Sequence, residues 1–156
     1  MSRAPFQLAL LDGVRDRATF NSGSDPLDRY LHEQVTQDVR RRVAACFVAT
    51  ADGTHIAGYY TLASASTGKR LPRHPTVPAI RMGRLAVDQG FKGQGLGSAL
   101  LADALSRAAR PEIAAYALMA DAKDDAAANF YRHHGFIALP DSPRTLFLPL
   151  ATVPAV

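Results

Sequence analysis

Arg84-Leu85-Ala86-Val87, followed by Lys92-Gly93-Gln94-Gly95-Leu96-Gly97-Ser98, is the stretch of sequence that decides the fold. The apolar run from Ile80 to Val87 predicts a strand, and the apolar spacing from Ser98 to Ala109 predicts a helix. The glycines between them let the backbone turn tightly and approach a ligand without a Cβ atom in the way. Because N–H groups at the start of a helix attract anions, the turn predicts a site for phosphate or pyrophosphate.

This turn does not fit the two commonest nucleotide-binding motifs. It lacks the Gly-Lys-Ser/Thr of a nucleotide triphosphatase loop, and its glycine spacing differs from the dinucleotide-binding fingerprint. Taken alone, a turn with three glycines is also compatible with a purely structural role.

The rest of the chain alternates between predicted strands and helices. A helix is expected to begin with Asp25 as its cap and Pro26 in its first position. Asp-Gly within residues 51–54 predicts a hairpin between two apolar runs. A helix is expected over Asp124–His134, with Gly135 ending it. The predicted strands are Phe6–Leu11, Val43–Thr50, His55–Ser64, Ile80–Val87, Ala114–Ala120, Phe136–Leu139 and Thr145–Leu148. This order predicts an α/β fold with a mixed central sheet flanked by helices, in one domain over residues 1–156.

Composition favours an ordinary globular protein. Of the 156 residues, 47% are apolar and 21% charged, and no run approaches the ~20 apolar residues of a membrane helix. The run Phe6–Leu11 lacks the flanking features of a signal peptide. Cys46 is the single cysteine and cannot form an internal disulfide. We therefore expect a cytoplasmic protein with no membrane partner.

Charge is distributed unevenly along the chain. The net charge is +4, and between Val39 and Val87 the one carboxylate is Asp52. The same segment holds eight cationic residues: Arg40, Arg41, Arg42, Lys69, Arg70, Arg73, Arg81 and Arg84. Clustered guanidinium groups attract phosphate, so this asymmetry favours an anionic partner. A solvated basic face, or a site for a cofactor's own phosphates, would give the same pattern.

Two motifs together resemble the GNAT acetyltransferases. The glycine turn and its Leu-Ala-Val strand resemble that family's pyrophosphate loop, Gln/Arg-x-x-Gly-x-Gly/Ala, with Lys92 where Gln or Arg is usual. Some 30 residues later, Asn129 to Phe136 looks like the family signature Asn-x-Tyr-x-x-x-Gly-Phe. The resemblance implies an N-acetyltransferase that uses acetyl-CoA as co-substrate, and no metal.

The resemblance also implies roles for individual residues. Backbone groups of Leu85, Ala86 and Val87 would pair with the pantetheine arm and orient the acetyl carbonyl. Lys92, Gly93, Gln94, Gly95, Leu96, Gly97 and Ser98 would hold the pyrophosphate, and Asn129 would contact the cofactor arm. Tyr131 would protonate the departing thiolate, a role that suits a phenol; the alternative is an aromatic ring that only packs.

Further segments resemble the acetyltransferase toxins of type II toxin–antitoxin modules. They are Phe20–Leu31, Ile56–Leu62, Leu71–Pro75, Gly83–Asp88 and Thr145–Leu150, with Ser22 where that family often has Cys. This resemblance implies acetylation of the α-amino group of aminoacyl-tRNA, a ribbon-helix-helix antitoxin as partner, and a homodimer. The candidate contacts to tRNA are Arg40, Arg41, Arg42, Lys69, Arg70 and Arg73.

The acceptor amine is the least determined part of the chemistry. The strand Ile80–Val87 contains no carboxylate to act as a base, which favours an α-amino acceptor of pKa ~8 over a lysine or polyamine amine of pKa ~10. Cys46 lies in an apolar strand pattern, so we expect it in the core and expect direct transfer of the acetyl group. Two alternatives remain open: an acetyltransferase for aminoglycosides or polyamines, and a non-catalytic partner in a DNA-binding toxin–antitoxin complex.

Overall fold

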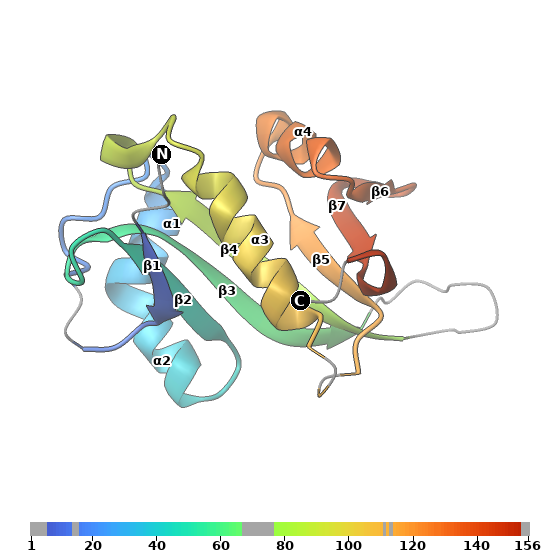
Figure 1. Ribbon diagram of the computed structural model, residues 1–156, viewed down its shortest axis with the longest axis horizontal. Helices are drawn as coiled ribbons and strands as arrows, with labels where there is room; N and C mark the ends of the chain where they lie inside the picture. Colours follow the sequence, from blue (N-terminus) through green and yellow to red (C-terminus); the bar gives the residue numbers. More distant parts are fainter. Residues whose placement is uncertain (1–5, 14–15, 67–76, 111, 113, 154–156) are drawn as a thin grey trace. The chain divides into compact units, whose positions relative to one another are not determined.

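A computed structural model of the chain describes residues 6–13, 16–66, 77–110, 112 and 114–153 (Figure 1). In chain order, these residues form β1 (Gln7–Leu10), α1 (Asp25–Arg29), η1 (Tyr30–Gln34), α2 (Val35–Arg40), β2 (Ala45–Thr50), β3 (Ile56–Ser66), β4 (Pro78–Val87), η2 (Gln89–Phe91), α3 (Leu96–Ala108), β5 (Ala117–Asp121), α4 (Asp125–His133), β6 (Ile137–Leu139), β7 (Ser142–Pro149) and η3 (Leu150–Thr152). Every predicted strand is present, with bounds that differ by a few residues.

The strands hydrogen-bond in the order β1-β2-β3-β4-β5-β7-β6. β4 and β5 run parallel, whereas the pairs β1–β2, β2–β3, β5–β7 and β6–β7 are antiparallel. A parallel pair among antiparallel pairs is what makes the sheet mixed. The predicted fold class, an α/β fold with a mixed sheet and helices, is therefore confirmed.

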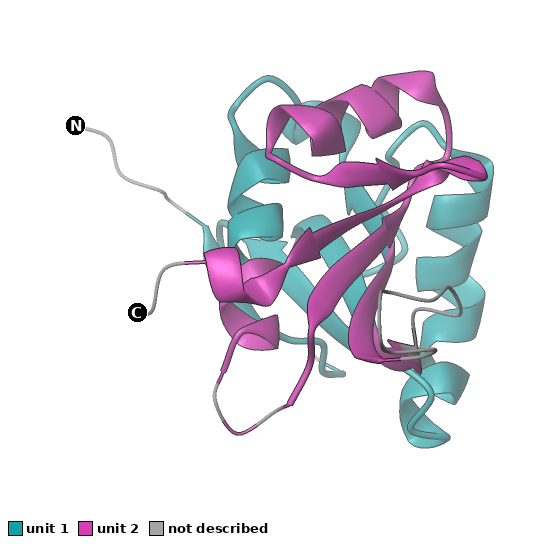
Figure 2. Ribbon diagram, turned by 90° about the vertical axis from the view of Figure 1, so that its right-hand side faces the viewer, with its two compact units in different colours: residues 1–62, 84–103 teal, residues 63–83, 104–156 magenta. Residues whose placement is uncertain are grey.

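The chain forms two compact units, coloured separately in Figure 2. Unit 1 consists of residues 1–62 and 84–103, and unit 2 of residues 63–83 and 104–156. Unit 1 holds the first helices, the hairpin and the glycine turn. Unit 2 holds β5, α4, β6 and β7.

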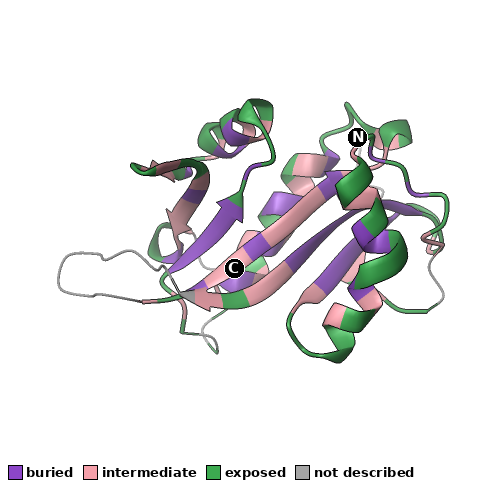
Figure 3. Ribbon diagram, turned by 180° about the vertical axis from the view of Figure 1, so that it is seen from behind, coloured by how far each residue is buried: buried purple, intermediate pink, exposed green. Residues whose placement is uncertain are grey.

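The core of unit 1 forms where the helical segment of residues 25–40 packs on the sheet. Its buried members are Phe20, Tyr30, Leu31, Val35, Cys46, Val48, Ile56, Tyr59 and Ala86. Figure 3 shows buried positions along the strands and exposed positions on the outer sides of the helices. Each fully buried Leu, Val or Phe side chain contributes about 1.5–3 kcal/mol relative to an exposed one, so this cluster holds the helical segment in place.

The start of the first helix differs from the prediction by one residue. Ser24, not Asp25, occupies the cap position, and Pro26 is the second helical residue. Asp28 instead reaches back, and its Oδ1 accepts hydrogen bonds from the backbone N–H of Ser22 at 2.9 Å and from the Ser22 hydroxyl at 2.7 Å. The prediction placed the acidic cap at the wrong residue, because a carboxylate in the first turn can serve the preceding loop as well as the helix.

A wide turn interrupts the helix that the sequence predicts from residue 25 onward. Residues Tyr30–Gln34 form a π-helical segment, and the N–H of Val35 bonds to the carbonyl of Tyr30. Such wide turns are rare and often lie near functional sites. Sequence periodicity does not reveal one extra residue within a helical segment of only about four turns.

The other predicted boundaries are nearly correct. The Asp124 side chain caps α4 by accepting from the N–H of Ala127 at 2.9 Å, and Gly135 follows with a φ of 93°. α3 begins at Leu96, two residues earlier than predicted, so Gly97 lies within the helix. β7 is longer than predicted, because its pairing with β6 extends the strand back to Ser142 and its pairing with β5 extends it to Pro149.

Candidate functional site

The glycine turn has the geometry that its sequence predicts. Asp88 directly follows β4 and accepts from the N–H of Gly90 at 2.9 Å, which closes a short turn. Gly93 and Gly95 then have φ angles of 82° and 79°. A Cβ atom at either position would meet nothing within 4 Å. These two glycines are therefore required by the left-handed backbone and leave open space above the turn.

This turn presents unpaired backbone donors to that open space. The N–H groups of Gly93, Gln94 and Gly95 bond to no residue that the structure describes. They lead directly into the first turn of α3, a helix of 13 residues. Donors without acceptors beside the positive end of a helix dipole form an anion site. The predicted phosphate loop therefore has the required arrangement in unit 1.

The opening segment of the chain is docked against this turn. The Lys92 ammonium donates to the carbonyl of Ser22 at 2.8 Å. The N–H of Asn21 donates to Asp88 Oδ1 at 2.9 Å, and the N–H of Gln89 donates to the carbonyl of Asn21 at 2.8 Å. Lys92 therefore braces the loop in addition to the phosphate contact that the sequence predicts, since an ammonium has three donors. Sequence reasoning missed this role, because Ser22 and Lys92 are 70 residues apart.

The predicted pantetheine-binding residues Leu85, Ala86 and Val87 form the end of β4, as expected. Ala86 is buried, whereas Leu85 and Val87 are partly exposed. A Cβ atom on Gly58 of β3 would lie 3.0 Å from the carbonyl oxygen of Ala86. Glycine at residue 58 thus allows β3 to approach this strand closely.

Tyr131 lies on α4 in unit 2, with 5% of its surface exposed. Its ring packs on Phe130 and Phe136, with centroid distances of 5.4 and 5.5 Å. Burial, and secondarily the charge of Asp121, raises the pKa of the Tyr131 hydroxyl above its usual value of about 10. This hydroxyl has no hydrogen-bond partner among the described residues, although buried tyrosines usually have one. Tyr131 is therefore a protonated donor with no acceptor in the part of the chain that the structure describes.

Asn129 is exposed on the same helix. Its Oδ1 accepts from Arg132 Nη1 at 2.8 Å, which fixes the side chain and leaves its NH₂ group as a donor. The predicted cofactor residues are thus divided between the units: residues 85–87 and 92–98 lie in unit 1, and Asn129 and Tyr131 lie in unit 2.

The basic residues Arg40, Arg41 and Arg42 are exposed at the end of α2. Arg42 has a φ of 59°, an unusual value for a residue with a side chain. The other predicted tRNA contacts, Lys69, Arg70 and Arg73, lie outside the described residues, as does the segment Leu71–Pro75.

Cys46 is 1% exposed within β2, which confirms the prediction that it belongs to the core. Burial raises the pKa of its thiol to about 12. Because the thiolate is the nucleophile, this side chain is inert at neutral pH.

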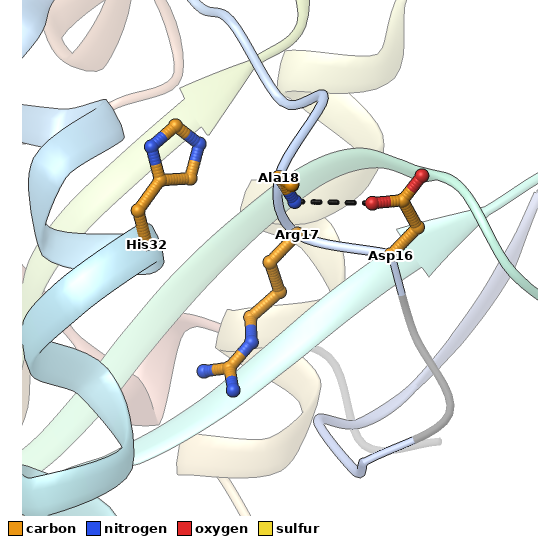
Figure 4. A pocket seen from close by; sticks show the side chains of 4 residues that line it. All are labelled: Asp16, Arg17, Ala18 and His32. Carbon is orange, nitrogen blue, oxygen red and sulfur yellow. Dashed lines mark hydrogen bonds between the residues drawn. The ribbon is translucent and has the colours of Figure 1, made fainter.

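A separate cavity of about 460 Å³ lies in unit 1 and is lined by Asp16, Arg17, Ala18 and His32 (Figure 4). Arg17 Nη1 donates to Thr36 Oγ1 at 2.8 Å, and His32 Nε2 lies 3.1 Å from the carbonyl oxygen of Phe20. Asp16 accepts from the N–H of Ala18 at 3.0 Å. These polar groups hold the loop before Phe20 against the helical segment, and none of them belongs to the predicted sites.

The described part of the chain contains no cluster of three or more His, Cys, Asp or Glu side chains arranged to hold a metal ion. Within the same part of the chain, no helix is both long enough and apolar enough to span a membrane.

Comparison with known proteins identifies the family. The family model for the acetyltransferase (GNAT) domain matches residues 42–138. A tRNA-acetylating toxin of Mycobacterium tuberculosis is 37% identical over 93% of this chain and 90% of its own length. Among solved structures, AtaT complexed with acetyl-methionyl-tRNAfMet matches with a TM-score of 0.87 and 24% identity, over 95% of this chain and 96% of that one. A tyrosine-to-phenylalanine mutant of AtaT, bound to acetyl-CoA and to the C-terminus of the antitoxin AtaR, also matches with a TM-score of 0.87 and 24% identity, over 96% of both chains.

The structure and the comparisons agree. The mixed sheet, the glycine turn with its unpaired donors and the tyrosine on α4 are what the resemblance to GNAT enzymes led us to expect. The family model covers more than half of the chain, and the toxin from Mycobacterium tuberculosis is similar over nearly all of it. The chain therefore belongs to the GNAT acetyltransferase family and is related to the tRNA-acetylating toxins of toxin–antitoxin systems.

Proposed function

We propose that this protein transfers the acetyl group of acetyl-CoA to the α-amino group of aminoacyl-tRNA and thereby acts as a toxin that blocks translation. The observation that carries this proposal is the 37% identity, over nearly the whole chain, to a tRNA-acetylating toxin. The described geometry supports the cofactor half of the proposal through the unpaired N–H groups of residues 93–95.

In this proposal the cofactor lies along the end of β4. Backbone groups of Leu85, Ala86 and Val87 pair with the pantetheine arm and orient the acetyl carbonyl. The N–H groups of Lys92 to Ser98 hold the pyrophosphate, with the Lys92 ammonium adding positive charge, and Asn129 contacts the arm. The N–H donors for the pyrophosphate thus come from a turn in which Gly93 and Gly95 already have the left-handed conformation, so the backbone need not rearrange to bind it.

Chemistry proceeds by direct transfer. The neutral α-amino nitrogen attacks the acetyl carbonyl carbon, the carbon–sulfur bond breaks, and an amide forms as the nitrogen loses one proton to solvent water. The Tyr131 hydroxyl donates to the sulfur of the departing thiolate. Its raised pKa keeps it protonated at neutral pH, which a donor requires. A covalent acyl-enzyme on Cys46 is not needed, and the burial of that thiol disfavours it.

The acceptor side fits an α-amino group and a polyanion. β4 offers no carboxylate base, and an amine of pKa ~8 is already partly neutral at pH 7. The exposed guanidinium groups of Arg40, Arg41 and Arg42 suit tRNA phosphates. We propose that Lys69, Arg70 and Arg73 also contact the tRNA.

The proposal extends to partners and location. The protein acts in the cytoplasm, where charged tRNA is found, and forms a homodimer. A ribbon-helix-helix antitoxin neutralises it. The support for an antitoxin partner comes from a solved relative, the AtaT toxin, whose mutant is bound to the C-terminus of the antitoxin AtaR.

The deciding experiment is incubation with labelled acetyl-CoA and a pool of charged tRNAs, with uncharged tRNA and polyamines as controls. We expect label on the charged pool alone. Label on polyamines instead would favour the small-amine alternative, and no label despite measurable acetyl-CoA binding would favour the non-catalytic one.

Tyr131→Phe tests the mechanism in the same assay. This variant keeps the ring packing and removes the donor, so we expect turnover to fall by ~100-fold or more with little change in KM for acetyl-CoA. Tyr116→Phe is the matched control, because it removes one hydroxyl from an exposed tyrosine of the same unit. Equal turnover in wild type and Tyr131→Phe would remove Tyr131 from the mechanism.

A further inference from the structure

Arg84 is a cation in the interior of a strand, and it lies immediately before the pantetheine-binding residues. It belongs to β4, two residues before Ala86, so both side chains point to the same face of the sheet. Ala86 belongs to the buried cluster that contains Tyr30 and Tyr59. Arg84 is partly buried beside that cluster.

The guanidinium of Arg84 lies on the face of an aromatic ring. Its Cζ atom is 3.6 Å from the centroid of the Tyr30 ring. At this distance the guanidinium is in direct cation–π contact with the ring. The N–H donors of a guanidinium lie in its plane, at the edge of the group, so a contact through its face leaves them unused.

Tyr30 provides a rigid support for this contact. Its ring is 4% exposed and stacks on Tyr59, with a centroid distance of 6.4 Å and an interplanar angle of 15°. The Tyr30 hydroxyl donates to Asp38 Oδ2 at 2.8 Å, and the Tyr59 hydroxyl donates to the carbonyl of Leu27 at 2.6 Å. The position of the guanidinium is therefore determined by side chains that cannot easily move.

The donors of Arg84 have no acceptor in this setting. Among the described residues, Arg84 makes no hydrogen bond and no ion pair, although Asp38 is close enough for the two charges to influence each other. For comparison, Arg81 on the same strand forms an ion pair with Asp121. A partly buried guanidinium with donors that no described residue uses has them available to water or to a ligand. A guanidinium fork matches a phosphate, to which it binds through two N–H groups at once.

We propose that Arg84, held over the ring of Tyr30, binds the phosphate of the terminal nucleotide of aminoacyl-tRNA and so positions the α-amino group for transfer. This inference rests on the proposed function. The reacting amine sits on an ester of the terminal ribose, and the nearest anion along that nucleotide is its 5′-phosphate. Arg84 directly precedes the residues proposed to orient the acetyl carbonyl, so a phosphate bound there would leave the amine within one nucleotide of the acetyl group. Polyamine acceptors carry no such anion.

The test uses two minimal acceptors that differ in one group: aminoacyl-adenosine with and without a 5′-phosphate. For wild type, we expect the phosphate to raise kcat/KM by about 10-fold or more, as a charge-assisted contact would. In Arg84→Met that gain should disappear, while activity on the acceptor without phosphate and KM for acetyl-CoA stay near wild type. Arg84→Lys, which keeps the charge and loses the fork, should retain part of the gain.

Arg81→Met is the matched control, because it removes the same charge from the same strand at a residue already paired with Asp121. It should keep the full gain from the phosphate. An equal loss of kcat/KM on both acceptors in Arg84→Met would show that Arg84 acts on folding or on the transfer step itself. A raised KM for acetyl-CoA would show that Arg84 binds the cofactor. Either result overturns the inference. If the wild-type protein acetylates charged tRNA but Arg84→Met keeps the full gain from the phosphate, this inference is overturned and the proposed function stands. A wild type inactive on every charged acceptor overturns the proposed function and this inference with it.

Discussion

Replacing Arg42 by glycine should stabilise the protein, although it removes a charged side chain from a helix end. Beyond the last turn of α2, the N–H of Val43 bonds to the carbonyl of Asp38 and the N–H of Arg42 bonds to the carbonyl of Val39, both at 3.0 Å. This pair of bonds is the Schellman arrangement, which places one residue in the left-handed conformation. Glycine usually fills that position, and here Arg42 fills it with a φ of 59°.

The size of the effect follows from two opposing contributions. The left-handed conformation costs a residue with a Cβ atom roughly 1–2 kcal/mol, which glycine avoids. Glycine loses more freedom on folding, which offsets roughly 0.4–1 kcal/mol of that gain. The net increase in the free energy of unfolding is therefore about 0.5–1 kcal/mol. For a chain of 156 residues this corresponds to a rise in Tm of about 1–4 °C.

Arg40→Gly is the matched control for urea and thermal unfolding. Arg40 is the last residue of α2 and is equally exposed, so the same charge is lost while glycine is placed in a helical conformation. This variant should be destabilised by about 0.5–1 kcal/mol. The two variants should thus shift in opposite directions, and any effect of net charge cancels in their difference. A decrease in stability for Arg42→Gly, similar to that of Arg40→Gly, would refute the reasoning.

Binding provides a second measurement on the same proteins. If both guanidinium groups contact tRNA phosphates, each variant should weaken tRNA binding and reduce the slope of log K against log salt by about 1. Arg42→Gly would then be a more stable protein that binds its substrate less well. Such a result would explain why a strained position carries arginine.

Three further predictions follow from the packing and the buried titratable groups. Gly58→Ala should cost about 1–3 kcal/mol in urea unfolding, because its Cβ atom would lie 2.9 Å from Leu100 Cδ1 and 3.0 Å from the Ala86 carbonyl; an unchanged midpoint would contradict the close packing. Cys46 should resist alkylation in the native state at pH 8 and react in urea, as followed by mass spectrometry, because burial raises the pKa of its thiol to about 12. Burial also raises the pKa of Tyr59 and Tyr131, so the folded state holds these protons more tightly than the unfolded state does. Their contribution to stability is complete below pH ~10 and is lost as the pH rises further, so denaturation at pH 9 and 11 should show a lower free energy of unfolding at the higher pH.

Much of the fold was predictable because it depends on neighbouring residues. The apolar runs predicted the strands, and Asp-Gly at residues 52–53 predicted the hairpin, whose Asp52 accepts from the N–H groups of Thr54 and His55. Gly135 as the residue after α4 was also identified, since left-handed turns act within one helical turn. Asp124 was expected inside this helix, and the structure shows that it is the cap. Gly93 and Gly95 belong to the same class, and they carried the prediction of the phosphate loop.

Other features required contacts between distant residues, and only the tertiary structure revealed them. Ser22 bonds to two residues, since its hydroxyl donates to Asp28 and its carbonyl accepts from Lys92. The acidic residues near the helix start could therefore not be assigned to a cap from sequence alone. In the sequence, Arg84 was one of several cations. The feature that could have drawn attention to it was its position as a charged residue inside a predicted apolar strand. Its role depends on Tyr30, 54 residues away, whose ring lies against the guanidinium, while no described residue accepts a hydrogen bond from Arg84.

The sequence by itself thus determined the order of strands and helices, the glycine turn, the signature tyrosine on α4 and the family. These depend on local backbone preference and on short motifs, which adjacent residues encode. The tertiary structure decided which polar side chains are paired within the protein and which have unused donors. That distinction depends on distances between segments far apart in the chain. On β4 it separates Arg81, which is paired with Asp121, from Arg84, which has no hydrogen-bond or ion-pair partner among the described residues.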